Sequence, residues 1–377
     1  MKRSFAMVLT VFLLMGCLCG CIRTSAPEGL LNESEPEERM QLDYATQFAV
    51  DYYPGGYKLI SMSDGSRFLV IPEGGSLPEG IAGDITPLYQ PVENIYLAAT
   101  AAMCLFDALD RLDAIRLSGS RAESWYIENA RAAMEEGKIL FAGRYSEPDY
   151  EMLLDNHCPL AVESLMIGHA SEVKDKLEEL GIAVLVDLSS SESHPLGRTE
   201  WIKLYGAILN EEETANALFA EQAKYLSETG MEDTGKSVAF FHVSSSGYVV
   251  TRKSGDYVSK MIELAGGNYI FDDLGSRDTD TSTVTIEMET FFASAKDADI
   301  IIYNSAIGGE IYNIEDLIEK NSLMAELKAV QNDNVWCTGQ NMYQETTGLG
   351  QMIDSFHLIF SGQADDLDEV PYLHRLH

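Results

Sequence analysis

The residue types that most often carry out catalysis do not form a recognisable motif in this chain. The sequence has no Gly-x-Ser-x-Gly nucleophile motif and no His-Glu-x-x-His zinc motif, and no Cys-x-x-Cys pair occurs beyond residue 21. Its 7 histidines are scattered, and no two are spaced four residues apart. We therefore predict that the protein is not an enzyme and that it carries no cofactor and no metal site of its own.

Arginine and aromatic side chains in loops are the residues best suited to hold a small ligand. Guanidinium groups bind carboxylate or catecholate oxygens, and aromatic faces pack on a planar macrocycle or a ferric complex. Ligands of parallel sheets bind beyond the carboxyl ends of the strands, so we select residues that follow predicted strands. The predicted ligand-binding residues are Arg121, Trp125, Arg144, Tyr145, His194, Arg198, Tyr248, Arg252, Tyr303, Gln340 and Tyr343.

The same loops contain further polar and apolar candidates, among them Lys253, Asn304, Met342 and Gln344. Tyrosine is also a known ligand of haem iron. Tyr145, Tyr303 and Tyr343 could take that role, although we do not assign it to them.

Short strands and helices alternate along the chain, and this alternation predicts where these loops begin. In the first half we expect strands at 58–62, 67–71, 94–98, 114–117, 159–162 and 182–188, and helices at 100–109, 122–136, 149–155, 171–180 and 199–209. In the second half we expect strands at 237–243, 247–252, 299–303 and 334–337, and helices at 257–265, 286–295, 314–320 and 348–360. Strands that alternate with helices imply parallel sheets with right-handed crossovers.

One uninterrupted helix separates the two halves. The segment 210–228 contains no Gly or Pro, Asn210 is a candidate N-cap, and Glu213 stands at the capping-box position. Its apolar residues recur at helical spacing, and about 19 residues span roughly 28 Å. The predicted fold is therefore α/β, with two Rossmann-like lobes at 42–209 and 231–377, joined by one long rigid helix at 210–230, and with a ligand cleft between the lobes.

The composition restricts the partners of the protein. Of the 377 residues 46% are hydrophobic, which indicates a globular chain, and the formal net charge is −34. Such an acidic surface would repel nucleic acid and anionic lipid. We therefore expect no nucleic-acid partner and membrane contact only through an anchor.

The first 41 residues are typical of a lipoprotein leader and a tether. Lys2 and Arg3 precede an apolar run at 5–16 that is too short to span a membrane. The runs LMGC and LCGC end in Cys17 and Cys21 and resemble bacterial lipoboxes, and we favour lipidation of Cys21, with Cys17 as second choice. Residues 22–41 are rich in Glu, Ser and Pro, so we expect a flexible tether. This predicts a protein held by lipid on the outer face of the cytoplasmic membrane.

Several runs of the sequence resemble the class III substrate-binding proteins of ABC importers. They are GRYSEPDYEMLLDNHCPLAVES (143–164), LEELGIAVLVDL (177–188), LGRTEWIKLYGAILNEEETANALFAEQ (196–222), TIEMETFFASAKDADIIIYNS (285–305) and NDNVWCTGQNMYQ (332–344). Their order and spacing cover about residues 57–361. The commoner Pro-Asp pair is missing at 159–162 and at 297–299, which leaves the subfamily open.

The resemblance implies a function, a ligand class and a docking mode. Proteins of this class deliver iron-siderophores, haem or cobalamin to a permease and its ATPase. One acidic residue at the top of each lobe meets arginines of the permease. The matching positions are Glu172 and Glu289, the latter chosen over Glu287. We expect a monomer that captures a small-molecule chelate in the interlobe cleft. The alternative is a secreted, lipid-anchored metal-binding or adhesive module on the same scaffold.

Overall fold

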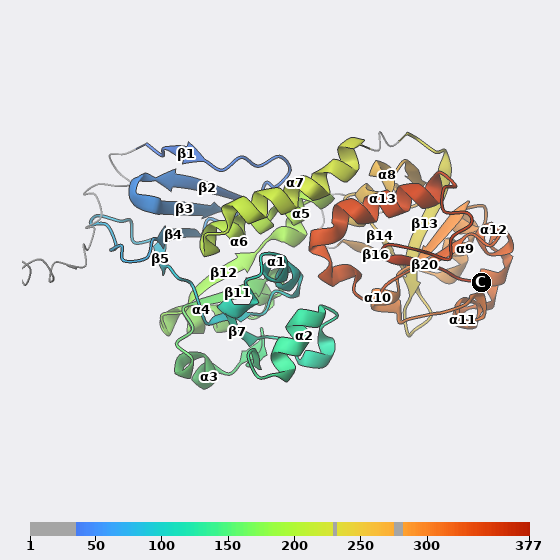
Figure 1. The fold of residues 1–377 in the computed structure, drawn as a ribbon. Coiled ribbons are helices and arrows are strands. Elements are labelled where there is room, and N and C mark those ends of the chain that lie inside the picture. Colours follow the sequence, from blue (N-terminus) through green and yellow to red (C-terminus); the bar gives the residue numbers. More distant parts are fainter. Residues whose placement is uncertain (1–34, 229–231, 275–281) are drawn as a thin grey trace, which may run out of the picture.

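The structure of this protein, a computed structural model, describes residues 35–228, 232–274 and 282–377. Figure 1 shows two lobes side by side, the N lobe on the left and the C lobe on the right, with helix α7 (Glu212–Glu228) running along the top from one towards the other. The predicted α/β class with two lobes is confirmed. Residues 1–34, with the predicted signal peptide, Cys17 and Cys21, lie outside the described part of the chain.

The N lobe opens with a five-stranded sheet of which the sequence predicted only the central hairpin. Its strands follow the order β1 (Glu38–Arg39), β2 (Phe48–Tyr53), β3 (Tyr57–Met62), β4 (Arg67–Ile71) and β5 (Ile85–Tyr89). Strand β1 pairs antiparallel with β2, and the backbone N–H groups of Glu37 and Met40 also donate to β2 carbonyls. The expected flexible tether at 22–41 is therefore wrong for its last residues. Residues 37–40 pair with the edge of β2 and belong to the sheet.

The second sheet of the N lobe is parallel and bears the predicted loops. Its order is β12 (Ala183–Asp187), β11 (Leu160–Ser164), β6 (Ile95–Leu97), β7 (Ile115–Ser118) and β8 (Leu140–Phe141), and each neighbouring pair is parallel. All five residues of β12 are buried, as expected of a strand covered on both faces. A short hairpin of β9 (Gly143–Arg144) and β10 (Glu147–Pro148) follows β8.

The helices of the N lobe are shorter than expected. The predicted helix 122–136 divides into η4 (Ala122–Ser124) and α2 (Glu128–Glu135), because Trp125 and Ile127 have extended backbone conformations. The predicted helix 199–209 divides into α5 (Pro195–Glu200) and α6 (Ile202–Leu209). The other helical segments are α1 (Met103–Ala108), α3 (Tyr150–Asp155), α4 (Ser171–Glu179), η1 (Pro54–Gly56), η2 (Thr100–Ala102), η3 (Leu112–Ala114), η5 (Leu165–His169) and η6 (Ser189–Ser191).

The C lobe is built on one mixed sheet. Its order is β16 (Thr283–Ile286), β14 (Val249–Arg252), β13 (Lys236–Val243), β17 (Ile300–Tyr303), β18 (Val335–Thr338), β20 (Leu373–Arg375) and β19 (Glu369–Val370), and β15 (Gly267–Tyr269) also pairs with β13. Strands β13, β17 and β18 are parallel to one another. The helical segments are α8 (Tyr257–Leu264), α9 (Met288–Ala295), α10 (Ser305–Gly308), α11 (Ile314–Lys320), α12 (Lys328–Gln331), α13 (Leu349–Phe360), η7 (Ser322–Glu326), η8 (Met342–Gln344) and η9 (Thr346–Gly348).

Helix α7 packs on both lobes, against α6 of the N lobe and α13 of the C lobe. It begins two residues later than predicted, because Asn210 is not its N-cap. Asn210 adopts a left-handed conformation (φ 61°) that ends α6. Its side-chain oxygen accepts hydrogen bonds from Lys58 (2.7 Å) and Gln90 (2.8 Å). The Glu211 carbonyl instead accepts from the backbone N–H of Ala215 in the first turn of α7.

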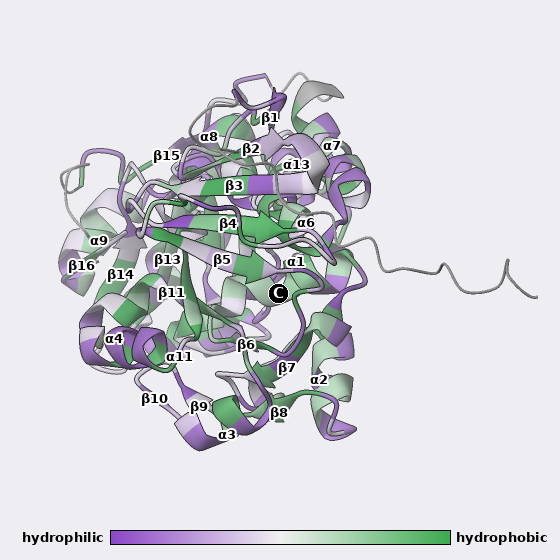
Figure 2. Cartoon of the chain, turned by 90° about the vertical axis from the view of Figure 1, so that its left-hand side faces the viewer, coloured by the Kyte–Doolittle hydropathy of each residue, from purple (hydrophilic) through white to green (hydrophobic). Residues whose placement is uncertain are grey.

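Each lobe has its own large hydrophobic core. One core joins the inner face of the first sheet, the parallel sheet and α5 to α7, and the other lies around the mixed sheet and α13. Leu226, near the end of α7, packs against both cores. Figure 2 shows hydrophobic colour on the inner strands, such as β4 and β11, and hydrophilic colour on the outer side of α4. The two cores are separate, and the lobes contact each other mainly through α7 and α5, which pack against α13.

Candidate functional site between the lobes

Loops at the carboxyl ends of β7 and β18 hold the two lobes together. The backbone N–H of Tyr126 donates to the side-chain oxygen of Gln344 (2.9 Å), whose amide nitrogen donates to the Ser124 carbonyl (2.8 Å). The Tyr126 hydroxyl donates to the side-chain oxygen of Gln340. We call these four residues the clasp. Gln344 thus bonds the N lobe through both atoms of its amide.

A second contact between the lobes places an arginine on an aromatic ring. The Cζ of Arg198, on α5 of the N lobe, lies 3.7 Å from the ring centroid of Tyr257, the first residue of α8 in the C lobe. One terminal nitrogen of Arg198 donates to the Ser190 carbonyl (2.7 Å). Burial lowers the pKa of Arg198, and the aromatic face offsets part of the cost of desolvating the cation.

A second arginine lies buried on the C-lobe side of this contact. Arg252 ends β14, is only 7% exposed, and donates to the Tyr343 hydroxyl. The nearest oxygen of Asp256 lies 3.6 Å from its other terminal nitrogen. The Tyr343 hydroxyl also accepts from the amide nitrogen of Asn304 (2.8 Å), and the Asn304 oxygen has no hydrogen-bond partner among the described residues.

Hydrogen bonds, an ion pair and a ring contact connect these residues into one group, and Arg198 also lowers the pKa of the buried Asp187 carboxyl against the effect of burial. Burial raises the pKa of Asp256, and Arg252 and Arg198 both oppose that shift. Burial also raises the pKa of Tyr257. We call this group the seam cluster: Arg198, Arg252, Asp256, Tyr257, Asn304 and Tyr343. It contains two guanidinium groups and one carboxylate, and it spans both lobes.

Five of the predicted ligand-binding residues belong to these contacts or lie beside them. Arg198, Arg252 and Tyr343 are in the seam cluster, and Gln340 is in the clasp. His194 caps α5 next to them, because its Nδ1 accepts from the backbone N–H of Leu196 (3.2 Å). Burial lowers the pKa of His194 to about 4, so this capping ring is neutral near pH 7.

The other predicted residues lie elsewhere. Tyr303 is fully buried, and its hydroxyl donates to the Gly308 carbonyl (3.0 Å), while Trp125 is 2% exposed in the N-lobe core. Neither side chain has a surface to offer a ligand in this structure, because each fills a core. Arg121 is exposed beside the Phe141 ring. Arg144 and Tyr248 are exposed as well, and Tyr145 packs at the edge of the N-lobe core.

Sequence reasoning missed the partners of the selected residues. Tyr126 follows the selected Trp125 directly, and its exposed ring, rather than the buried indole, reaches the other lobe. Asp256 and Tyr257 open α8, where Asp256 accepts from the backbone N–H of Val258 (2.9 Å). Asp256 could have been identified from the sequence. It is a typical N-cap residue at the start of a predicted helix, four residues after the selected Arg252.

The two predicted docking acids are both exposed at helix starts. Glu172 lies in the first turn of α4 in the N lobe, and Glu289 lies in the first turn of α9 in the C lobe. Each of these helices immediately precedes a strand of a central sheet, β12 or β17. Strand β12 lies at the edge of its sheet and β17 lies inside its sheet, so the role of the two acids stays a prediction.

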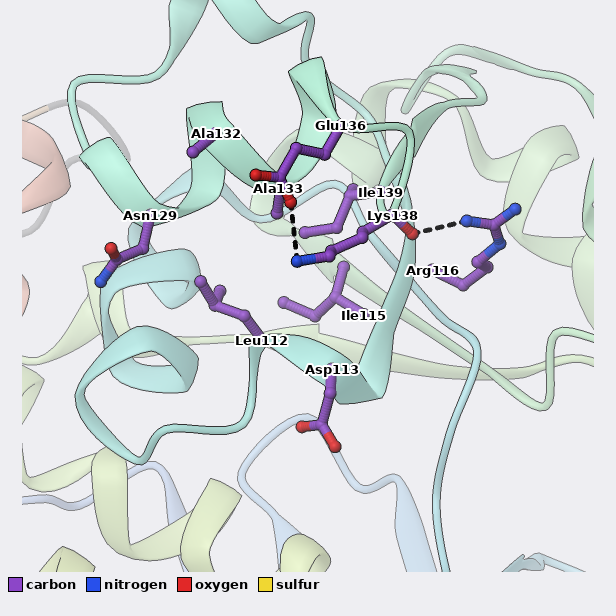
Figure 3. A pocket seen from close by; sticks show the side chains of 10 residues that line it. All are labelled: Leu112, Asp113, Ile115, Arg116, Asn129, Ala132, Ala133, Glu136, Lys138 and Ile139. Atoms are coloured by element: carbon purple, nitrogen blue, oxygen red, sulfur yellow. Dashed lines mark hydrogen bonds and ion pairs between the residues drawn. The ribbon is translucent and has the colours of Figure 1, made fainter.

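A pocket of about 670 Å³ lies on the other side of the N lobe, at the amino ends of β7 and β8. Figure 3 shows its apolar floor of Leu112, Ile115 and Ile139 and its charged rim, where Lys138 pairs with Glu136 (2.7 Å). A second pocket, of about 260 Å³, lies behind α7 between Phe219 of the N-lobe core and Tyr372 of the C lobe. None of the predicted ligand-binding residues lines either pocket.

One segment matches the sequence of a phosphate-binding loop but does not have the strand-loop-helix structure of that motif. Residues 230–237 match Gly-x4-Gly-Lys-Ser. A phosphate-binding loop of this kind lies after a strand and before a helix, whereas here α7 comes before the segment and β13 begins at Lys236. Glu232 and Asp233, within the segment itself, add negative charge. We therefore assign no phosphate site to this segment.

Among the described residues, no three His, Cys, Asp or Glu side chains are grouped so that they could hold a metal ion. In the same part of the chain, no helix has both the length and the apolar composition needed to cross a bilayer.

Comparison with known proteins gives the chain a family match and several similar structures. The sequence model of a family described as periplasmic binding protein matches residues 123–342, more than half of the chain. Two lipoproteins of Methanocaldococcus jannaschii, both described as uncharacterized, are similar over almost the whole length. One is 23% identical over 91% of this chain and 89% of its own, and the other is 24% identical over 100% of both.

Solved structures show the same fold. A periplasmic haem-binding protein of Pseudomonas aeruginosa superimposes with a TM-score of 0.57 and 14% identity, over 76% of this chain and 98% of its own. A periplasmic vitamin B12-binding protein of Vibrio cholerae gives a TM-score of 0.52 and 17% identity, over 72% and 98%. Both structures are matched almost completely, so about a quarter of this chain has no counterpart in them.

Proposed function

The chain belongs to the periplasmic binding protein family, and from that premise we propose that it is the solute-binding protein of an ABC importer. In this proposal it captures a ferric siderophore, haem or cobalamin-like ligand between its lobes and delivers the ligand to a permease. The observation that carries the proposal is the seam cluster. Arg198 of the N lobe lies over the ring of Tyr257 in the C lobe, and both Arg198 and Arg252 act electrostatically on Tyr257.

Exposed apolar side chains around the same edges support a large ligand. Large hydrophobic residues in water usually mark a binding surface when they are grouped. Six of them, each at least 41% exposed, lie in loops or short helical segments that follow strands of the two lobes. They are Tyr126, Leu165, Met166, Tyr248, Ile307 and Tyr312. Such a rim suits a chelate with a broad apolar surface.

The ligand class is tested by the thermal stability of the purified protein in the presence of candidate ligands. A ligand that binds only the folded state raises the melting temperature. We expect a shift of several degrees with at least one member of a panel of ferric siderophores, haemin and cobalamin. If every member leaves the melting temperature unchanged, and calorimetry also detects no binding, the proposal is wrong.

Docking to the permease is proposed to use Glu172 and Glu289. Both are exposed, and Asp or Glu paired with Arg gives strong, directional contacts between proteins. The double variant Glu172→Arg/Glu289→Arg should reduce uptake or permease binding about tenfold or more, while ligand binding stays unchanged. Glu178→Arg, on the exposed side of α4, is the matched control. Equal uptake by all three proteins would rule out these two residues.

Attachment to the membrane is proposed to occur through a lipid on Cys21 or, failing that, on Cys17. The similarity to two archaeal lipoproteins supports an anchored, extracytoplasmic protein. Mass spectrometry of the membrane-extracted protein should find a lipid-modified cysteine, and Cys21→Ala should release the protein from membranes. Retention of Cys21→Ala together with loss of Cys17→Ala would move the modification to Cys17.

A further inference from the structure

We propose that the pocket of about 260 Å³ behind α7 is a second binding site and that it takes a small organic cation with a compact apolar body. None of the residues that line this pocket belongs to the seam cluster or to the clasp. The inference therefore goes beyond the proposed function, and it holds whatever ligand the seam cluster contacts.

The walls of the pocket come from both lobes, which is the first observation. Segments α1, α5, α6 and α7 contribute on the N-lobe side, and η9 and the turn before β20 contribute from the C lobe. Thr199, in one wall, donates its hydroxyl hydrogen to the Thr346 carbonyl of the C lobe (2.8 Å), so a hydrogen bond connects the two sides. Binding pockets are commonly preformed and often lie between domains, and this pocket fits that description.

The inner surface of the pocket is apolar and aromatic, which is the second observation. Phe219 and Ile202 are buried, and Leu218 packs at the edge of the N-lobe core. Tyr372 adds an aromatic ring from the C-lobe side. The electron-rich face of an aromatic ring attracts an ammonium group, and quaternary ammonium ligands are recognised in this way. These side chains therefore suit a cation whose charge is surrounded by methyl or methylene groups.

The charge at the pocket is negative, which is the third observation. Among the described residues that line it, only Glu221 is charged, and this side chain is exposed at the rim. Lys203 lies on the Phe219 ring, with its Nζ 4.4 Å from the centroid, but Glu200 pairs with this lysine at 2.7 Å. The charge of Lys203 is thus balanced inside the chain. An anionic ligand would be repelled by the Glu221 carboxylate, whereas a cation would be attracted to it.

The conformation of Tyr372 is the fourth observation. Its φ is 70°, in the left-handed region that bulky residues rarely adopt. Such conformations cost free energy and cluster at binding and active sites. The surroundings hold Tyr372 in place, because Gly348 leaves room for its hydroxyl where a Cβ would overlap it, and the backbone N–H of Gly339 donates to its carbonyl (3.0 Å). Burial and the nearby Glu345 carboxylate raise the pKa of Tyr372 to about 12, so its phenol is neutral near pH 7.

The test uses three probes that share a shape and differ in charge. Choline is a cation, neohexanol replaces the choline nitrogen by carbon and is neutral, and the tert-butylacetic acid anion carries a carboxylate. We expect choline to bind at least about fivefold more tightly than neohexanol, and the anion to bind most weakly. Titration calorimetry on the purified protein, without a chelate, measures the three affinities. Equal affinities for choline and neohexanol, or no binding of choline, would overturn the inference.

Two variants assign the effect to this pocket. Glu221→Gln removes the charge at the rim and should reduce the preference for choline over neohexanol at least about threefold. Glu213→Gln, exposed on the same helix and outside the pocket, is the matched control and should keep the full preference. Ala108→Leu places a larger side chain in the lining at the end of α1, and it should weaken choline binding about tenfold or more. The exposed position of Glu221 keeps the test valid if Ala108→Leu fails to fold.

The outcomes separate this inference from the proposed function. If choline binds the wild type and the folded Glu221→Gln and Ala108→Leu variants equally well, it binds elsewhere and the inference is wrong. Competition between choline and a bound chelate for one site would also overturn the inference, while the proposed function would stand. If none of the chelates binds but choline binding responds to the variants as expected, the inference stands and the proposed function fails.

Discussion

Buried glutamates in the N lobe differ in whether the fold supplies partners for them. Glu200 accepts from the backbone N–H groups of Tyr44 (2.7 Å) and Ala45 (2.8 Å) and from Lys203 (2.7 Å). Glu192 likewise accepts from the backbone of Thr46 (2.9 Å). Glu163, near the carboxyl end of β11, is 0% exposed, and neither of its oxygens has a partner within the described residues. The first two carboxylates hold residues 43–47 against α5 and the loop before it, whereas burial of the third without a partner lowers the stability of the fold.

The effect of Glu163 on the free energy of unfolding should depend on pH. Burial raises the pKa of Glu163 from 4.5 to about 8, so the folded protein keeps a proton that the unfolded chain loses above pH 4.5. Wild-type stability should therefore fall relative to Glu163→Gln as the pH rises from 4.5 to 8, by up to about 5 kcal/mol, and the difference should be constant above pH 8. Urea unfolding across this range measures it.

The control for this prediction is Glu178→Gln on the exposed side of α4. A difference between wild type and Glu163→Gln that does not change with pH would show that the carboxyl is ionised when folded. The charge of Glu163 contributes to the raised pKa values of Tyr96 and Tyr150. Both titrate above this pH window, so they do not obscure it.

Glu200 should be among the most costly carboxylates to replace. In Glu200→Gln the amide offers one acceptor where three backbone N–H groups and Lys203 now converge. Leaving a buried lysine without its carboxylate typically costs about 3–5 kcal/mol. Chemical denaturation should show a loss of this order, whereas Glu213→Gln, exposed on α7, should leave stability within about 0.5 kcal/mol. If Glu200→Gln lowers the free energy of unfolding only slightly, Glu200 does not hold residues 43–45 against α5.

At the scale of elements, glycines set how closely α7 approaches its neighbours. A Cβ at Gly206 in α6 would lie 2.7 Å from the Cβ of Ala215 in α7. A Cβ at Gly350 in α13 would lie 2.3 Å from the carbonyl oxygen of Gln222 in α7. The Gln222 side chain also accepts from the backbone N–H of Gln351 (3.3 Å). Helix α7 is thus tightly packed against one helix of each lobe.

Gly350→Ala should push α13 away from α7. The added methyl group meets backbone, which cannot rotate aside, and overpacking of this kind costs about 1–3 kcal/mol. We expect a lower melting temperature and a larger radius of gyration in solution scattering. Gly83→Ala, where a Cβ has nothing within 4 Å, is the control. Unchanged scattering and stability in Gly350→Ala would mean that α7 does not fix the spacing of the lobes.

At the scale of the whole molecule, the lobes are joined along α7 and again at the clasp. The Thr199 hydroxyl also donates to the Thr346 carbonyl (2.8 Å), between these two regions. The first connection is helix on helix, whereas the clasp consists of hydrogen bonds near solvent. Such bonds are each worth only about 0.5–1.5 kcal/mol. The clasp is therefore the side on which the lobes can separate at low cost.

Gln344→Ala should favour separation of the lobes. It removes two interlobe hydrogen bonds, which should increase the separated population about tenfold. Spin labels at Ser171→Cys and Ser294→Cys, both exposed and on different lobes, would report the distance distribution. Gln363→Ala, which removes only a contact with Ser361, is the control. If the distribution with Gln344→Ala matches wild type, the clasp does not hold the lobes.

The sequence by itself determined the order and type of most elements. Helix α11 matches its prediction completely, β13, β17 and α13 differ by one residue at one end, and β18 is shifted by one residue. These signals are local. Asp256 and Asn313 cap the helices that follow them, and Gly181 and Gly266 adopt positive φ where the preceding helices end. Side-chain caps and glycine conformations act over a few residues, so they can be predicted from the sequence alone.

Only the tertiary structure decided which of the predicted residues meet. The Arg252–Tyr343 bond joins positions 91 residues apart, and the Tyr126–Gln340 bond joins positions 214 apart. Nothing in the local sequence distinguishes Arg252 from the exposed Arg144, or Trp125, which turns into the core, from Tyr126, which reaches across. The first sheet was largely missed for the same reason, since its inner face packs on segments that are distant in the sequence, among them β12 and α6. Local preferences set the elements, but the packing of two separate cores sets which loops face each other, and that packing is a property of the whole chain.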